Sequence, residues 1–308
     1  MTATPMLGKP VADAIVTKVK ADVVDLKERY GMTPQLRVIQ VGRDAASEVY
    51  LQNKIKSFAK IGIAVKPHTF DSTVSVAELE DTISALSEDK SVHGIMIGLP
   101  LPTHIENSTG AARGKFDIFD RIHQFKDVDG VSRHSTAELY RGQLERLTFL
   151  PSTALAVSRM LKFYGVETTG KRVVVAGRND ITGKPIHHML GGRMGNATVS
   201  WCHRFTPKET HDDLTRAADI VITCVGSPRY QLKADVLRRG STVIDVGTRV
   251  DKDGNLIGDV DFDGVKHVAA FLTPVPRGVG PVTVASLMEN VVRATRFCAG
   301  EDVRGYQL

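Results

Sequence analysis

The chain has 308 residues, a formal net charge of +5 and a pI near 9.0, and 42% of its residues are hydrophobic and 24% charged. This composition is close to the average of globular proteins in water, and the length suits two domains of about 150 residues each. Lysines and arginines are dispersed among acidic residues, which excludes a nucleic-acid-binding tract and favours a small anionic ligand.

No apolar run reaches the roughly 20 residues that a membrane-spanning helix needs, and the N-terminus does not resemble a secretory signal. We therefore expect a cytoplasmic protein without a membrane partner. The three cysteines, Cys202, Cys224 and Cys298, include no C-x-x-C pair. They predict reduced, buried thiols and no metal site.

Helices and strands alternate along the first half of the chain. Apolar residues recur at helical spacing or form short runs, and Ser75 and Glu78 form a capping box at the start of one helix. This alternation predicts a parallel sheet covered by helices, in an N-terminal α/β catalytic domain that spans 1–150. The expected elements are a helix over 11–30, a strand over 36–42, a helix with Tyr50 and Lys54, a strand near 63–65, a helix over 75–88 and a strand over 94–99.

A second alternation begins after a domain boundary near Leu150. A helix within 151–170 is followed by apolar strands over 171–177, 197–201, 220–225 and 242–246. This succession is typical of a doubly wound, Rossmann-type nucleotide-binding domain, here over 151–282. We expect a final helix over 283–297, within a segment 283–308 that packs back on the first domain, and a ligand cleft between the two domains.

Tyr50 and Lys54 are four residues apart on the helix that follows the strand over 36–42. At this spacing their side chains share one helix face, and the carboxyl end of a strand is where open α/β sheets bind ligands. A phenol that packs on an aromatic substrate and an amine with a lowered pKa would form a compact catalytic pair. The alternative is an ordinary amphipathic helix with a solvated lysine and a half-buried tyrosine.

Gly177 and Gly183 flank a segment between a buried strand and a helix, where a phosphate-binding turn is expected. The pattern is not G-x-G-x-x-G, but the glycines allow close approach and the helix offers unpaired N–H groups to a pyrophosphate. Arg178 in the turn and His203 and Arg204 after the next strand are basic, which favours NADP over NAD. The alternative is a plain strand-to-helix turn.

Two further segments contain turn-forming residues in front of helices. Residues 126–130 (Lys-Asp-Val-Asp-Gly) combine two acids with a glycine, and residues 273–283 alternate proline and glycine before the final helix. The prolines stiffen the second segment, and its glycines permit a flat ligand to approach the backbone. As isolated patterns, the first is more often a turn than a site, and the second is equally well explained as a rigid connection between domains.

Taken together and in order, these motifs resemble those of the bifunctional methylenetetrahydrofolate dehydrogenase/cyclohydrolase family. The resemblance runs almost end to end, and the order of the motifs makes it specific. It implies a homodimer that oxidises 5,10-methylenetetrahydrofolate to the methenyl form with NADP and then hydrolyses it to 10-formyltetrahydrofolate. The matching segments are Ser47-x-x-Tyr50-x-x-x-Lys54, 99–102 (Leu-Pro-Leu-Pro), 126–130, 177–185, 243–247 (Val-Ile-Asp-Val-Gly) and 273–283.

The resemblance also assigns roles to individual residues. It implies that Tyr50 stacks on the folate, that Lys54 assists acid–base steps and the activation of water, and that Asp129 anchors the pterin. The other implied substrate-binding residues are Leu99, Pro100, Pro276 and Gly280. The implied cofactor-binding residues are Gly177, Arg178, Asn179, Gly183, His203, Arg204, Gly226 and Thr248.

The sequence departs from the family pattern at ligand-facing positions. Gly98 stands where the family has a glutamine that is thought to hold the lysine, so we expect hydrolysis to be weakened more than hydride transfer. Other departures are Asn179 for serine, Thr182 for valine, Thr248-Arg249 for Ile-Asn, Arg277 for glycine and a longer segment over 103–125. A diverged paralogue is the alternative: an NAD(P)-dependent oxidoreductase with a changed substrate, or a non-catalytic folate- or nucleotide-binding protein.

Overall fold

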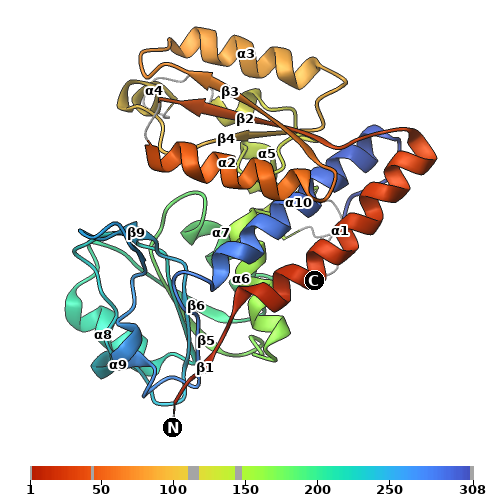
Figure 1. Cartoon of the computed structure of the whole chain (residues 1–308). Coiled ribbons are helices and arrows are strands. Elements are labelled where there is room, and N and C mark those ends of the chain that lie inside the picture. The colour runs from red at the N-terminus through yellow and green to blue at the C-terminus, as the bar shows by residue number, and fades with distance from the viewer. Residues whose placement is uncertain (1, 43–44, 110–117, 143–147, 306–308) are drawn as a thin grey trace. The chain divides into compact units, whose positions relative to one another are not determined.

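The computed structural model describes residues 2–42, 45–109, 118–142 and 148–305, without the side chains of 45–50, 53 and 107–109. The chain divides into two compact units (Figure 1). Unit 1 comprises Met1–Ala14 and Pro151–Ser286, and unit 2 comprises Ile15–Leu150 and Leu287–Gln307. Two long helices, α1 (Gly8–Tyr30) and α10 (Val279–Cys298), contribute residues to both units.

Unit 1 contains a parallel six-stranded sheet with the strand order β1-β11-β8-β7-β5-β6. Every residue of β7 and β8 is buried, as expected for central strands with both faces covered. The strands are β1 (Thr4–Pro5), β5 (Arg172–Ala176), β6 (Thr198–Cys202), β7 (Ile220–Thr223), β8 (Thr242–Asp245) and β11 (Phe271–Leu272), with a separate antiparallel pair β9 (Arg249–Val250) and β10 (Leu256–Ile257). The helices are α6 (Ser152–Phe163), α7 (Gly183–Gly191), α8 (Lys208–Ala217), η3 (Ala234–Val236) and α9 (Phe262–Val265).

The N-terminal segment differs from the expected domain over 1–150. Thr4 and Pro5 pair with Phe271 and Leu272 of β11, so the first residues of the chain extend the sheet of unit 1. Two-residue strands are too short to show a hydrophobic period, which is why neither β1 nor β11 was predicted. The final helix also begins earlier than predicted, at Val279, because Pro281 lies in its first turn, where a missing N–H costs no helical hydrogen bond.

Unit 2 contains a parallel three-stranded sheet in the order β3-β2-β4. Ser75 is confirmed as the N-cap of α3, since its side chain accepts the Glu78 N–H at 3.2 Å. The strands are β2 (Gln35–Val41), β3 (Ala64–Phe70) and β4 (Gly94–Ile97). The helices are α2 (Ala45–Ala59), α3 (Val76–Glu88), α4 (Thr103–Thr109), η2 (Ile118–Arg121) and α5 (Arg133–Arg141).

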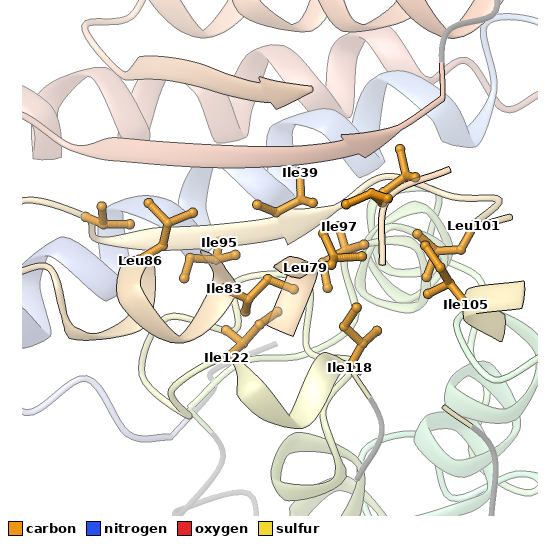
Figure 2. Close-up of a cluster of buried hydrophobic side chains, with 13 residues drawn as sticks. Ile39, Leu79, Ile83, Leu86, Ile95, Ile97, Leu101, Ile105, Ile118 and Ile122 are labelled. Carbon is orange, nitrogen blue, oxygen red and sulfur yellow. The ribbon is translucent and has the colours of Figure 1, made fainter. Parts of the chain in front are cut away.

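An isoleucine- and leucine-rich core packs one face of this small sheet (Figure 2). Ile95 and Ile97 of β4 meet Leu79 and Ile83 of α3, and Ile118 of η2 closes the cluster. Side chains alternate along a strand, so Met96, which lies between Ile95 and Ile97, points to the face of β4 opposite this core. The face of β4 that carries Met96 contacts the candidate site.

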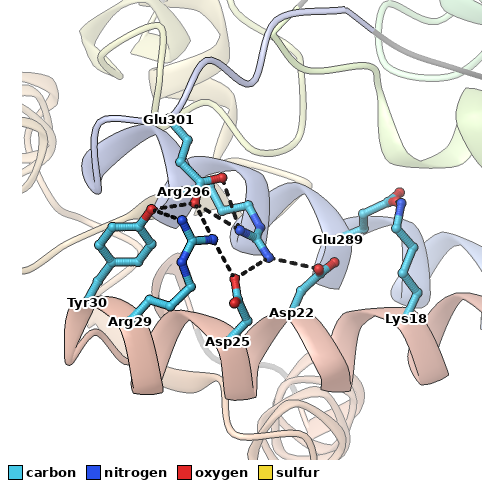
Figure 3. Close-up of polar contacts among 8 residues, drawn as sticks. All are labelled: Lys18, Asp22, Asp25, Arg29, Tyr30, Glu289, Arg296 and Glu301. Carbon is cyan, nitrogen blue, oxygen red and sulfur yellow. Dashed lines mark hydrogen bonds and ion pairs between the residues drawn. The ribbon is translucent and has the colours of Figure 1, made fainter.

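Within unit 2, the C-terminal part of α10 is joined to α1 by charged groups (Figure 3). The Arg296 guanidinium donates to Asp22 at 2.9 Å and to Glu301 at 3.0 Å, and it lies 3.0 Å from the carboxylate of Asp25. The Tyr30 hydroxyl also donates to Glu301 at 2.8 Å. Arg29 also lies 3.3 Å from Asp25 and 3.5 Å from Glu301, so two cations among three carboxylates balance charges that would otherwise repel each other. Among the described residues, no helix is both long and apolar enough to cross a membrane.

Candidate active site

Lys54 lies on α2 and is almost completely buried, with 7% of its surface exposed. Burial lowers the pKa of its amine, and the carboxylate of Asp129 partly opposes that shift. Its Nζ donates to the Met96 sulfur at 3.3 Å. The structure therefore brings Lys54 and Asp129 close together, and the solvated lysine of the alternative interpretation is wrong.

The segment over 126–130 reaches Lys54 because it runs alongside β4. The Ile95 N–H donates to the Lys126 carbonyl at 2.8 Å, and Ile95 forms a parallel bridge with Asp127. The Asp127 carboxylate accepts the Ser132 N–H at 2.9 Å, at the N-terminus of α5, so this acid is structural. Asp129 is half-buried and is the acid whose field acts on Lys54.

Gly98 follows β4, and its N–H donates to the Ile39 carbonyl at 2.7 Å. A Cβ added at Gly98 would lie 3.2 Å from that carbonyl oxygen, and no other described atom would be within 4 Å. Its φ is outside the left-handed region. A Cβ here is therefore tight against this one backbone oxygen, which has to shift by a few tenths of an ångström, and is clear of the other described atoms. The next residues, Leu99 and Pro100, are exposed and joined by a cis peptide bond.

Tyr50, the other predicted catalytic residue, belongs to α2 by its backbone. Its side chain is outside the described residues, as is part of the long segment over 103–125. The stacking role of Tyr50 stays a prediction.

In unit 1, the predicted phosphate-binding turn packs tightly against the end of β7. Gly177 has φ +120°, and a Cβ there would lie 2.6 Å from both the oxygen and the sulfur of Cys224. Asn179 holds the turn: its amide donates to the Cys224 carbonyl at 3.2 Å, and its side-chain oxygen accepts the N–H groups of Thr182 at 2.7 Å and Gly183 at 3.3 Å. The helix N-terminus beyond Gly183 was expected to offer unpaired N–H groups. That expectation is wrong, because the Lys184 N–H donates to the Asn179 carbonyl at 3.1 Å and the Ile186 N–H to the Thr182 carbonyl at 3.0 Å.

The predicted cations gather around one exposed aromatic ring at the carboxyl edge of the sheet. The guanidinium of Arg178 lies 5.8 Å from the ring centre of Phe205, and that of Arg204 lies 4.6 Å from it. The Nδ1 of His203 accepts the Phe205 N–H at 3.3 Å, so His203 shapes this loop. One guanidinium from the turn after β5 and one from the loop after β6 thus place positive charge at this edge of the sheet.

Sequence analysis missed a pair of buried carboxylates beneath the loops that follow β7 and β8. Asp259 accepts the N–H groups of Val225 at 2.7 Å and Gly226 at 3.0 Å, which fixes Gly226 at φ +62°. Asp245 accepts the Thr223 hydroxyl at 3.0 Å and the Asp259 N–H at 3.1 Å. Desolvation raises the pKa of Asp245 to about 6. The sequence feature that could have revealed this pair is the acid inside the apolar run Val-Ile-Asp-Val, because a buried acid needs a hydrogen-bond or ion-pair partner.

Arg249 joins this pair from the strand β9. Its guanidinium lies 3.6 Å from the Asp259 carboxylate and donates to the Gly258 carbonyl at 2.7 Å. Arg249 thus turns inward as a structural residue, although sequence comparison marked it as a change at a ligand-facing position. Thr248 beside it is exposed.

The Pro/Gly segment starts at the end of β11. The Thr273 hydroxyl accepts the Asp245 N–H at 2.6 Å, and a cis peptide joins Val275 to Pro276. Arg277 has φ +84°, and its carbonyl accepts the Gly8 N–H at 2.8 Å. Of the predicted substrate-binding residues, Pro276 and Gly280 thus belong to unit 1, and the others belong to unit 2.

Comparison with known proteins identifies the family. Residues 6–129 match the family model "Tetrahydrofolate dehydrogenase/cyclohydrolase, catalytic domain", and residues 151–298 match "Tetrahydrofolate dehydrogenase/cyclohydrolase, NAD(P)-binding domain". The chain belongs to the tetrahydrofolate dehydrogenase/cyclohydrolase family. The resemblance and the two-domain α/β fold class that were predicted from the sequence are confirmed.

Relatives within the tetrahydrofolate dehydrogenase/cyclohydrolase family match over nearly their full length. The chain is 39% identical to the "Bifunctional protein FolD" of Bacillus anthracis over 296 residues, which are 96% of this chain and 98% of that protein. It is 35% identical to the solved bifunctional FolD of Campylobacter jejuni (TM-score 0.86, 96% and 99% covered). It is 34% identical to the Trypanosoma brucei enzyme, solved in complex with NADP and an inhibitor (TM-score 0.87, 97% and 99% covered).

Proposed function

We propose that this protein oxidises 5,10-methylenetetrahydrofolate to 5,10-methenyltetrahydrofolate with NADP and hydrolyses the product to 10-formyltetrahydrofolate. The observation that carries the proposal is the buried Lys54 near Asp129 in a chain that matches both family domains. Burial lowers the pKa of the Lys54 amine, which shifts it toward the neutral form that a general base requires.

The carboxyl edge of the sheet in unit 1 fits NADP. Gly177 lets the turn pack directly against Cys224 at the end of β7, where any Cβ would clash, and Arg178 and Arg204 supply cations for a 2′-phosphate. Asn179 and Asp259 hold the two neighbouring loops by main-chain hydrogen bonds. NADP, when bound, supplies the acceptor for the hydride. The residues of the protein align the folate carbon, whose cation is stabilised by the two nitrogens beside it.

Lys54 and Asp129 serve the hydrolysis. The oxygen of a water molecule bonds to the methenyl carbon while the neutral Lys54 amine takes one of its protons. The bond from that carbon to N5 then breaks, and N5 receives the proton held by the lysine. The hydroxyl group on the carbon loses its remaining proton to the solvent, which leaves a formyl group on N10. Asp129 stabilises the lysine while it is protonated and accepts hydrogen bonds from the pterin.

Gly98 weakens the hydrolysis in this proposal. It offers no side chain to the face of β4 on which Lys54 lies, so the amine is less well oriented for water. Hydride transfer depends mainly on the alignment of the folate with the nicotinamide and is less affected.

The test pairs two assays on the purified protein: NADPH formation from 5,10-methylenetetrahydrofolate, and loss of 5,10-methenyltetrahydrofolate absorbance. Gly98→Gln should raise the kcat of hydrolysis several-fold and leave dehydrogenase activity within about twofold. Gly98→Leu is the matched control, because it fills similar space without an amide. Equal hydrolysis by all three proteins would refute the weakening, and cofactor turnover without folate would refute the substrate.

We also propose that the protein is a cytoplasmic homodimer. This rests on the family, and light scattering of the purified protein in solution tests the dimer. A mass equal to one chain at micromolar concentration would contradict it.

A further inference from the structure

The two faces of β4 carry different chemistry. Ile95 and Ile97 point into the aliphatic core with α3 (Figure 2), and Met96 between them points to the other face, where α2 lies. Met96 is half-buried rather than part of that core. A strand that needed only to pack would gain more from a branched aliphatic residue at this position.

The sulfur of Met96 meets the reactive end of Lys54. Their atoms are 3.3 Å apart, inside the distance at which a thioether accepts a hydrogen bond from nitrogen. Gly98, two residues farther on the same face, brings no side chain, and a Cβ there would lie 3.2 Å from the Ile39 carbonyl oxygen. The field of the Asp129 carboxylate also acts on this amine.

A thioether has a particular effect on an amine. It is a weak, polarisable acceptor, so it can orient an N–H bond without strongly stabilising the charged nitrogen. An amide oxygen in its place would accept a stronger bond from the ammonium form and would favour that form.

We propose that Met96 is a positioning residue, whose sulfur holds the Lys54 amine in place for proton transfer while leaving it free to lose its proton. The inference rests on the proposed function, because it gives Lys54 the role of a base. Met96 itself touches neither substrate nor cofactor in this account.

The experiment compares Met96→Leu and Met96→Gln with the unchanged protein. Hydrolysis of 5,10-methenyltetrahydrofolate is measured against pH, and the pKa of Lys54 is measured separately by competitive labelling with acetic anhydride and mass spectrometry. Met160→Leu is the control, since it removes a sulfur from the fully buried core of unit 1. Thermal unfolding of each variant shows whether it folds.

Met96→Leu should lower the kcat of hydrolysis about tenfold with KM within about twofold. Met96→Gln should move the labelling midpoint of Lys54 upward by about half a pH unit or more, together with the lower limb of the pH profile. Met160→Leu should change neither. Unchanged kcat in Met96→Leu and an unchanged midpoint in Met96→Gln would overturn the proposal.

The labelling of Lys54 also separates failure of the proposed function from failure of the positioning role of Met96. If the unchanged protein turns over neither folate but Met96→Gln shifts the Lys54 midpoint, the proposed function fails and the coupling of Met96 to Lys54 stands. If both folates are turned over and neither variant differs from the unchanged protein, the function stands and Met96 only packs.

Discussion

In unit 1, the buried carboxylates of Asp245 and Asp259 accept main-chain N–H groups from the loops after β7 and β8, whereas in unit 2 the buried Lys54 donates to a thioether. Hydrogen bonds to a charged acceptor contribute about 1.5–3 kcal/mol each, so several of them fix a loop in one geometry. The sulfur contact orients the amine with little preference for its charged form.

The carboxylate pair in unit 1 and the amine in unit 2 are held differently because their proposed roles differ. A cofactor cradle must present its backbone in one arrangement, and directional bonds to buried acids achieve this. A general base must exchange a proton near neutral pH, so strong stabilisation of its charged form would work against it.

The largest expected effect comes from Lys54→Met. Removal of the base should lower the kcat of hydrolysis by about 100- to 10,000-fold, the usual range for general acid–base catalysis. The variant should unfold at the same temperature or a higher one, because a buried amine is replaced by an apolar chain of similar length. Absorbance at the methenyl band and thermal unfolding measure both effects.

The stability gain of Lys54→Met should also depend on pH. The folded state lowers the pKa of Lys54 below its usual 10.5, so the unfolded state binds more protons between those two values and the stability of the unchanged protein rises with pH there. The advantage of the variant should be largest below this window and shrink as the pH approaches 10.5. Hydrolysis above about one tenth of the original rate would contradict the role of Lys54.

A second prediction concerns the pH dependence of unit 1. The folded state raises the pKa of Asp245 to about 6 from 3.8, so proton binding stabilises the fold below about pH 4 and this contribution is lost as the pH rises to about 6. The shift corresponds to about 3 kcal/mol. In urea unfolding, the stability of Asp245→Asn relative to the unchanged protein should therefore increase over this window.

Asp261→Asn is the matched control for Asp245. Its carboxylate caps α9 by accepting the Gly264 N–H and does not belong to the buried pair. It should leave the slope between about pH 4 and about pH 6 as it is. The test is how the unfolding free energy changes with pH, and not its value at one pH. The amide introduced by Asp245→Asn would meet N–H donors and destabilise the fold at every pH. Parallel curves for Asp245→Asn and the unchanged protein would show that Asp245 does not titrate in this window.

The alternation of helices and strands was predictable because each long element shows its own period. Lys54 was predicted from its spacing to Tyr50 after a buried strand, and Asp129 from the order of the motifs. In the structure the Asp129 carboxylate acts on the Lys54 amine. Ser75 was found as a cap because a cap is a local hydrogen bond, made within three residues. These features depend on short stretches of sequence, and short stretches are what a pattern can show.

The missed features depend on contacts between distant segments. Asp259 binds the N–H of Val225, 34 residues away, and nothing local to either residue indicates that bond. Met96 lies in a run of apolar residues that predicts a buried strand, and the run does not show which residue faces α2. The sequence placed Asn179 in the turn, but it did not show that the Asn179 side chain accepts the Gly183 N–H, because this bond depends on the folded geometry.

The smallest expected effect belongs to Arg249→Asn, which restores the residue of the family pattern. Arg249 donates to the Gly258 carbonyl and lies 3.6 Å from Asp259, so its loss should cost about 1–2 kcal/mol of unfolding free energy. The Val225 and Gly226 N–H groups still hold Asp259, which limits the cost. Urea unfolding and the KM for NADP, measured beside the exposed control Arg229→Asn, separate a structural role from a direct one. A KM that rises about tenfold while stability stays constant would mean that Arg249 contacts the cofactor, and the inward ion pair would then not explain its presence.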